Sequence, residues 1–178
     1  MRIGLISDTH LTDPDSDLHP GVYRGFAGVD LILHLGDIYA TFVLDRLEKL
    51  APVLGIQAYP DPPDPRLLPI RVVPLGGLKV GMIHNLGAPE TPMNVDVGLV
   101  IPSERPAREM LKRKFGEHLD VVVFGDTHEE LVEEQQGILF VNPGSPTYPG
   151  IKHELGSPGT VAMLEIVDGK ASAYVIQL

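Results

Sequence analysis

The chain has 178 residues, a net charge of −10 and no cysteine. This length suits one domain over residues 1–178, and the lack of cysteine excludes disulfides, cysteine-ligated zinc and thiol catalysis. The negative charge disfavours long nucleic acids as partners. No apolar stretch approaches the ~20 residues of a membrane span, and the first residues lack the features of a signal peptide. We therefore expect a cytoplasmic protein that does not enter a membrane.

Apolar runs of strand length recur along the chain and are separated by turn residues. They cover residues 2–7, 31–35, 53–54, 70–75, 78–83, 121–124, 130–134, 138–141, 160–167 and 171–176. Glycine-containing turns at 76–77, 135–137 and 168–169 predict three hairpins. Strands and helices alternate in the first half and hairpins dominate the second, so the pattern predicts a mixed α/β (α+β) fold.

Two segments have the apolar spacing of helices. Residues 41–50 follow a candidate N-cap, Thr41. Residues 103–115 lie between another candidate N-cap, Ser103, and a glycine stop, Gly116. Loops are expected at 11–21, at the proline-rich stretch 60–69 and at 85–102.

Four of the apolar runs are followed by side chains that can bind a metal. These side chains are Asp8, His10, Asp37, His84, Asp126 and His128. The carboxyl ends of strands form the ligand-binding edge of an open α/β sheet. The repeated pattern therefore predicts that positions 8, 10, 37, 84 and 128 converge on one cavity.

The ordered motifs match those of a known family. They are Ser7-Asp8-Thr9-His10, His34-Leu35-Gly36-Asp37, His84, Gly125-Asp126-Thr127-His128 and Asn142-Pro143-Gly144-Ser145. With them the chain resembles the calcineurin-like metallophosphoesterases, in particular their small prokaryotic phosphodiesterases. The resemblance implies two packed mixed β-sheets flanked by helices. It also implies hydrolysis of a small phosphoester by a metal-bound hydroxide that attacks phosphorus.

By position, the resemblance assigns a first ion to Asp8, His10, Asp37 and His128. A second ion would share Asp37 and bind His84, and these two are the candidate catalytic residues. Asp126 replaces a family histidine, and it would either bind the second ion or accept a proton from a neighbouring histidine. Nitrogen and oxygen ligands suit one or two divalent ions, with manganese first and iron, zinc, nickel or magnesium as alternatives.

The second ion site departs from the family pattern. The Gly-Asn that follows the third strand in the family reads Gly55-Ile56 here, so a ligand would come from water, Gln57 or Asp61. Because Gln57 is not an acid, it assists a departing oxygen poorly. The sequence therefore favours aryl over alkyl phosphodiesters.

Four further residues are candidates for substrate contact or for hydrogen-bonded support of a ligand: His34, Gln57, Asn85 and Asn142. His34 is expected in the core, and Asn142 is expected to shape a turn beside the metals. His153 is expected at the surface, with an approach to the site as the alternative.

A different class of function remains open. The same fold includes a retromer subunit whose site has degenerated and which acts as a protein-interaction scaffold. The altered second ion site would suit such a scaffold, whereas the complete first ligand set favours an enzyme. A homo-oligomer is compatible with either function.

Overall fold

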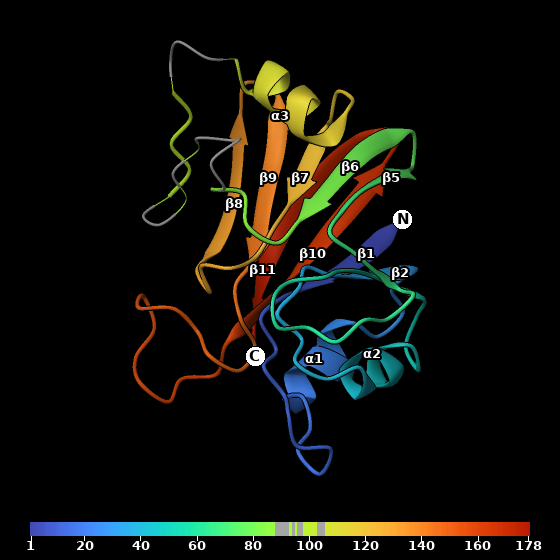
Figure 1. Cartoon of the computed structure of the whole chain (residues 1–178), viewed down its shortest axis with the longest axis vertical. Coiled ribbons are helices and arrows are strands. Elements are labelled where there is room, and N and C mark those ends of the chain that lie inside the picture. The colour runs from blue at the N-terminus through green and yellow to red at the C-terminus, as the bar shows by residue number, and fades with distance from the viewer. Residues whose placement is uncertain (88–92, 94, 96–97, 103–105) are drawn as a thin grey trace.

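The computed structural model describes residues 1–87, 93, 95, 98–102 and 106–178 (Figure 1). The strands are β1 (Arg2–Ile6), β2 (Leu31–His34), β3 (Val53–Ile56), β4 (Leu67–Leu68), β5 (Ile70–Leu75), β6 (Leu78–Ile83), β7 (Val121–Val123), β8 (Glu130–Gln135), β9 (Ile138–Pro143), β10 (Thr160–Val167) and β11 (Lys170–Gln177). The helices are α1 (Pro20–Gly25), α2 (Phe42–Leu47) and α3 (Ala107–Phe115).

The strands form two mixed sheets. A six-stranded sheet has the order β11-β10-β1-β2-β3-β4, and a five-stranded sheet has the order β5-β6-β7-β9-β8. In the first sheet β1 to β4 run parallel, and the β10–β11 hairpin joins β1 in antiparallel register. In the second sheet β6, β7 and β9 run parallel between antiparallel edges. This arrangement confirms the expected pair of mixed sheets flanked by helices.

Side-chain alternation along the strands separates three apolar layers. Val121 and Val123 of β7 point into the layer between the two sheets, whereas Val122 packs toward α3. Leu31 and Leu33 of β2 likewise face the layer between the sheets. Period-two alternation explains this division, because successive side chains of a strand point to opposite faces. Each fully buried large apolar side chain contributes about 1.5–3 kcal/mol to folding.

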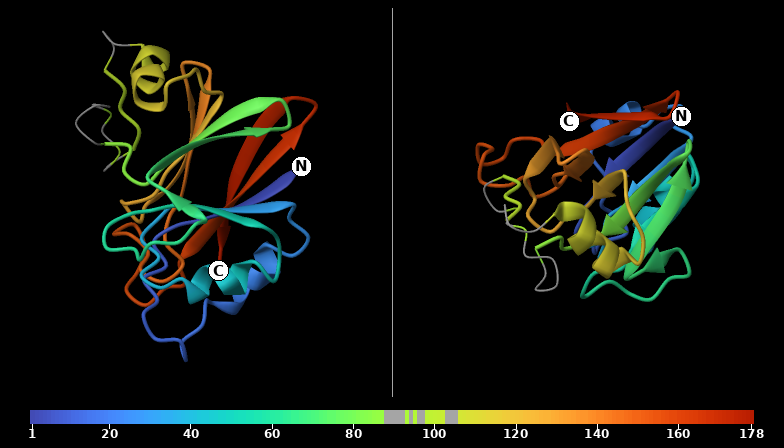
Figure 2. Two further views of the ribbon diagram at one scale, coloured as in Figure 1. Left: turned by 45° about the vertical axis from the view of Figure 1, so that its right-hand side comes forward. Right: turned by 90° about the horizontal axis from the view of Figure 1, so that it is seen from above.

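The helices cover the outer faces of the two sheets. Apolar side chains of α1 and α2 pack with Ile6, Ile32 and Met163 of the six-stranded sheet. Those of α3 pack with Phe140 and other residues of the five-stranded sheet. Figures 1 and 2 show α1 and α2 on one side of the paired sheets and α3 on the opposite side. Each helix therefore buries one apolar face, as amphipathic helices do.

The three predicted hairpins are confirmed, but both predicted helices are too long. The first helix covers Phe42–Leu47, and the side chain of Thr41 makes no capping hydrogen bond. The second helix begins at Ala107, and Pro106 before it occupies the N-cap position with an extended backbone. Ser103, the predicted cap, lies outside the described residues. Gly116 ends this helix as predicted, with a φ of 83°.

Two short elements were not predicted: α1 begins at the end of the loop expected at 11–21, and β4 lies within the loop expected at 60–69. α1 begins at Pro20, and the His19 side chain accepts a hydrogen bond from the backbone N–H of Gly21. β4 adds two residues of the proline-rich segment to the edge of the six-stranded sheet. Both elements are too short for a periodic signal, which explains why the pattern missed them. None of the described helices is long and apolar enough to cross a membrane.

Candidate metal centre

The ligand-type side chains follow strands that end at one edge of each sheet. β1 and β2 are parallel neighbours, as are β6 and β7, so the loops after them emerge together. The backbone N–H of Asp8 donates to the carbonyl of Gly36 over 3.0 Å, and that of His10 donates to Asp37 over 3.2 Å. Across the sheets, the N–H of Asp126 donates to Asp8 Oδ2 over 3.2 Å. These bonds fix the loops after β1, β2 and β7 against one another.

Four of the predicted side chains form a compact set of potential ligands: Asp8, His10, Asp37 and His128. One ligand atom from each lies within 4.8 Å of all the others. His10 Nε2 is 3.1 Å from Asp37 Oδ2 and 3.2 Å from His128 Nε2. Metal bonds of roughly 2.0–2.2 Å separate adjacent ligands by about 3.0–3.5 Å. The set therefore has the spacing that one cation requires.

Two carboxylate oxygens in this set have no hydrogen-bond partner. Asp8 Oδ1 and Asp37 Oδ1 are buried and accept no hydrogen bond from the residues that the structure describes, and His128 Nε2 and His84 Nε2 lie 3.6 Å and 4.0 Å from Asp8 Oδ1. A buried carboxylate oxygen without a hydrogen bond carries a large desolvation cost, which either protonation or a nearby positive charge offsets. A divalent cation between Asp8 and Asp37 would meet this need, and the residues present therefore fit such an ion.

Burial dominates the titration of the same side chains. It raises the pKa of Asp8 to about 6, although His84 and His128 act in the opposite direction. Burial also raises the pKa of Asp37 and lowers the pKa of His10. Without a cation the site thus favours neutral side chains, whereas a bound cation would favour ionised carboxylates and neutral imidazoles.

The candidate ligands share an uncommon backbone conformation. The φ angles are 54° at Asp8, 50° at His10, 58° at Asp37 and 60° at His128. Residues other than glycine rarely adopt this left-handed region, and it costs each of them about 1–3 kcal/mol. Such strain concentrates at functional sites, where the surrounding structure holds it in place.

Asp61 has a different role from the one considered in the sequence. Its carboxylate accepts hydrogen bonds from the backbone N–H groups of Asp37, Ile38, Tyr39 and Ala58, over 2.6–3.0 Å. With these four donors the carboxylate is already satisfied, so Asp61 is not a free replacement ligand. It instead holds the loop that carries Asp37.

His84 and Asp126 lie beside the compact set and outside it. His84 Nε2 is 4.0 Å from Asp8 Oδ1 and 3.6 Å from Asp126 Oδ1. His84 Nδ1 donates to the carbonyl of Leu35 over 2.8 Å, which directs Nε2 toward the carboxylates. Asp126 Oδ2 accepts a hydrogen bond from Asn85 over 2.8 Å. His84 and Asp126 therefore form a second, more widely spaced group of candidate metal ligands beside the first.

The structure shows where Ile56 and Gln57, the residues that depart from the family pattern, and His34 lie. Ile56 is fully buried in the apolar layer between the sheets, so it offers no ligand. The Gln57 side chain donates to the backbone carbonyl of Asp61 over 3.3 Å. His34 is fully buried and lies 3.2 Å from Thr9 Oγ1, and burial lowers the pKa of His34 to about 3. His34 therefore lies in the core, where the sequence predicted it, and its burial favours the neutral imidazole.

Side chains of the Asn142–Ser145 motif support the site through hydrogen bonds. Asn142 Nδ2 donates to the carbonyl of Gly125 over 3.0 Å, and Asn142 Oδ1 accepts from the N–H of Gly144 over 2.9 Å. Ser145 Oγ donates to the carbonyl of Asp8 over 2.7 Å. The sequence identified this motif but not the contact of Ser145 with Asp8, because no spacing rule links positions so far apart.

His153 is not the surface residue that the sequence suggested. Its Nε2 lies 2.8 Å from Glu130 Oε2, and the side chain is only 12% exposed. His153 also lines a pocket that His128 borders. The hairpin that carries Glu130 covers His153. The local polarity of the sequence does not reveal this long-range contact.

Comparison with known proteins agrees with this geometry. Residues 1–169 match the model of the calcineurin-like phosphoesterase superfamily domain, and the chain belongs to this family. A probable metallophosphoesterase of Methanothermobacter thermautotrophicus is 35% identical over 185 aligned residues, which cover 99% of this chain and 92% of the relative. Another, from Methanocaldococcus jannaschii, is 34% identical over 151 residues, covering 84% of this chain and 70% of the relative.

Two solved structures share the fold. Wild-type Vps29 of Entamoeba histolytica complexed with zinc has a TM-score of 0.68 and 22% identity, with 99% of each chain covered. A structure described as a novel archaeal phosphodiesterase has a TM-score of 0.64 and 22% identity, with 99% of this chain and 100% of that chain covered. At this identity both comparisons establish the architecture only.

Proposed function

We propose that the protein is a divalent-metal-dependent phosphodiesterase that acts on a small phosphoester. The unpaired, buried oxygens of Asp8 and Asp37, within a complete set of four ligands, carry this proposal. The family supports ester hydrolysis at phosphorus, and we propose a diester as the ester that is cleaved. We further propose manganese as the native metal and the cytoplasm as the location.

In this proposal Asp8, His10, Asp37 and His128 hold the first ion. His84 and Asp126, together with Asp37, would hold a second, weaker one. Bound cations would activate water and stabilise negative charge on the phosphoryl oxygens. The chain's own contribution is positioning. Asp61 holds the Asp37 loop, and the backbone carbonyl of Tyr148 accepts a hydrogen bond from Nδ1 of His128 over 2.6 Å. That bond leaves His128 Nε2 free to face the centre.

A protein-interaction scaffold is the second candidate function. The buried Ile56, which stands where the family carries an amide ligand, favours it. The scaffold hypothesis predicts no turnover and does not explain four ligand residues held in a strained conformation. We therefore place it second.

Metal analysis combined with a turnover assay tests the proposal. The purified chain should bind one or two manganese ions and hydrolyse bis(4-nitrophenyl) phosphate. His128→Ala removes one ligand and should lose both the ion and the turnover. His118→Ala, which alters an exposed histidine, is the control. Absence of both bound metal and turnover in the wild type would contradict the enzyme and favour the scaffold, and a fully active His128→Ala would refute the site.

A further inference from the structure

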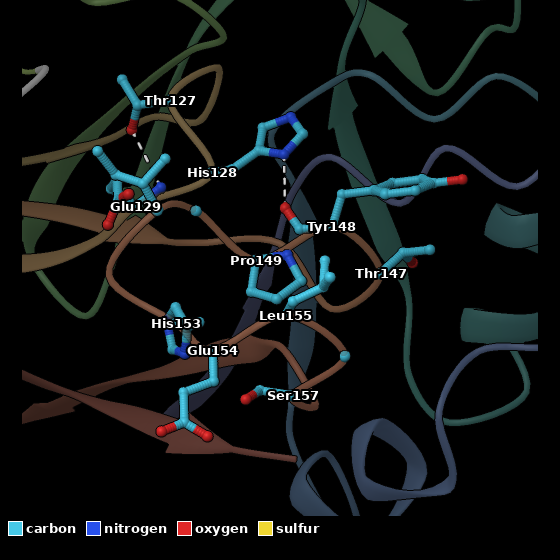
Figure 3. Close-up of a pocket in the computed structure, with 13 residues that line it drawn as sticks. Thr127, His128, Glu129, Thr147, Tyr148, Pro149, His153, Glu154, Leu155 and Ser157 are labelled. Atoms are coloured by element: carbon cyan, nitrogen blue, oxygen red, sulfur yellow. Dashed lines mark hydrogen bonds between the residues drawn. The ribbon is translucent and has the colours of Figure 1, made fainter.

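A pocket of about 760 Å³ opens directly beside the candidate metal centre (Figure 3). His128 forms part of its wall, so the pocket and the ligand set share a side chain. The opposite wall comes from the segment 147–157 that follows the Asn142–Ser145 motif. A group attached to a phosphorus atom at the metal centre could enter this pocket without leaving the site.

Tyr148 links the pocket to the metal centre. Its carbonyl is the hydrogen-bond partner of His128, as the dashed line in Figure 3 shows. Its ring lies 5.3 Å from the ring of His10, nearly perpendicular to it, and half of the Tyr148 side chain remains exposed. Tyr148 therefore contacts two of the candidate ligands and also lines the pocket.

Two other apolar side chains line the same pocket and are in contact with water. Ile151 is 97% exposed, and Leu155 is fully exposed. Water-exposed aliphatic side chains gathered around a concave site indicate a surface that a ligand covers. Together with Tyr148 they favour an apolar or aromatic occupant.

The charges around the pocket restrict the occupant further. None of the described residues that line it is lysine or arginine, whereas Glu129 and Glu154 both line it. Glu129 is paired with Lys152 over 3.4 Å, and His153 is paired with Glu130. The pocket therefore offers no free cation for a second phosphate or a carboxylate, and it suits an uncharged group.

We propose that this pocket binds one ester group of the substrate, and that this group is uncharged and aromatic. The inference rests on the proposed phosphodiesterase function and narrows its substrate class. A phosphodiester with an aromatic arm would place its phosphate at the metal ligands and its ring against Tyr148, Ile151 and Leu155. A phosphate ester with a second anionic group would bind poorly.

Binding of two matched diesters to the manganese-loaded protein tests the pocket by calorimetry. Diphenyl phosphate and dimethyl phosphate carry the same charge and differ only in their ester groups. The wild type should bind diphenyl phosphate at least about tenfold more tightly, because the pocket removes apolar surface from water. Ile151→Ser and Leu155→Ser should each weaken diphenyl phosphate about threefold or more and leave dimethyl phosphate within about twofold.

Val167→Ser is the matched control, because Val167 is also an exposed apolar residue and lies in β10, outside the pocket lining. It should leave the affinity for both diesters unchanged. Equal affinity of the wild type for the two diesters, no measurable binding of diphenyl phosphate, or unchanged binding by both pocket variants would overturn the proposal. A partner protein that covers the same side chains predicts the first of these results.

Turnover of bis(4-nitrophenyl) phosphate by the same samples separates this proposal from the proposed function. Discrimination between the two diesters without turnover would support the pocket and refute the enzyme. Turnover without discrimination would support the enzyme and refute the pocket.

Discussion

The Nε2 atoms of His10 and His128 lie 3.2 Å apart, although the two residues are 118 positions apart in the chain. Each imidazole makes a further contact. His10 Nε2 lies 3.1 Å from Asp37 Oδ2, and His128 Nδ1 is hydrogen-bonded to the carbonyl of Tyr148. Two nitrogen atoms that face each other at this distance share either a proton or a cation. The unpaired oxygens beside them make the cation the better physical explanation.

Manganese should stabilise the wild-type protein and have little effect on His10→Ala. An ion that binds only the folded state adds about 2.7 kcal/mol to the free energy of unfolding at one hundred times its dissociation constant. Thermal unfolding with manganese or with a chelator measures this. His118→Ala should respond like the wild type. An equal manganese response in His10→Ala would place the binding site elsewhere.

Asp61→Asn should lower the free energy of unfolding by roughly 3 kcal/mol, because it removes the charged acceptor of four backbone N–H groups. The same change should weaken manganese binding, since Asp61 holds the loop of Asp37. Chemical denaturation and calorimetry provide the two measurements. Asp15→Asn, in an exposed loop, should change stability by less than about 0.5 kcal/mol. Unchanged manganese affinity in Asp61→Asn would argue against this positioning role.

Gly125→Ala should damage both folding and metal binding. An added Cβ would collide with Ser7 Oγ and come within 2.8 Å of Asp8 Oδ2, in the tightest part of the site. Gly25→Ala is the matched control, because its Cβ would make an ordinary 3.4 Å contact with Ile176. We expect a loss of at least about 2 kcal/mol for the first variant and less than about 1 kcal/mol for the second. Equal stability of the two variants would contradict this packing.

Arg66→Met should lower stability at neutral pH, with a difference from the wild type that disappears in acid. Arg66 pairs with Asp45, Glu48 and Asp64, and its hydrogen bond lowers the pKa of Asp64 below the usual 3.8. A carboxyl with a depressed folded-state pKa stabilises the fold above its unfolded pKa, and this contribution is lost as the pH falls through the folded value. The difference should be about 1–2 kcal/mol above about pH 5. Urea titrations between about pH 2 and about pH 7, a range that spans the usual carboxyl pKa values, would measure this difference in stability. A difference that does not change with pH would exclude this origin.

The wild type should cleave 4-nitrophenyl methyl phosphate at least about 100-fold faster than dimethyl phosphate, because Gln57 cannot protonate a departing alkoxide. Gln57→Glu provides an acid at the same position, so it should narrow this ratio. Release of 4-nitrophenol and of methanol measures the two reactions. Comparable rates on both diesters in the wild type would show that another group acts as the acid.

The sequence predicted most of the fold because strand runs and glycine turns are local signals. The motifs at the ends of β1, β2 and β7 also supplied the four side chains that meet, whereas His84 at the end of β6 lies beside this set. The contacts that complete the site were not predictable in this way. The four bonds to Asp61 and the bond from Ser145 to Asp8 depend on chain segments that meet only after both sheets have packed.

The errors have a common physical origin. The helix ends were placed by capping residues, but α3 begins only after Pro106 and the side chain of Thr41 forms no capping bond. The polarity of His153 indicated the surface, whereas a partner on β8 holds it beside the pocket. In each case a tertiary contact or a fixed backbone angle outweighed the local preference.

The left-handed backbone at four positions, Asp8, His10, Asp37 and His128, carries a conformational cost for folding, although the side chains there are the candidate metal ligands. Glycine would occupy each of them with less conformational cost, but it would bind no ion. Folding alone would favour glycine at these positions, so the four side chains serve a need that folding does not impose.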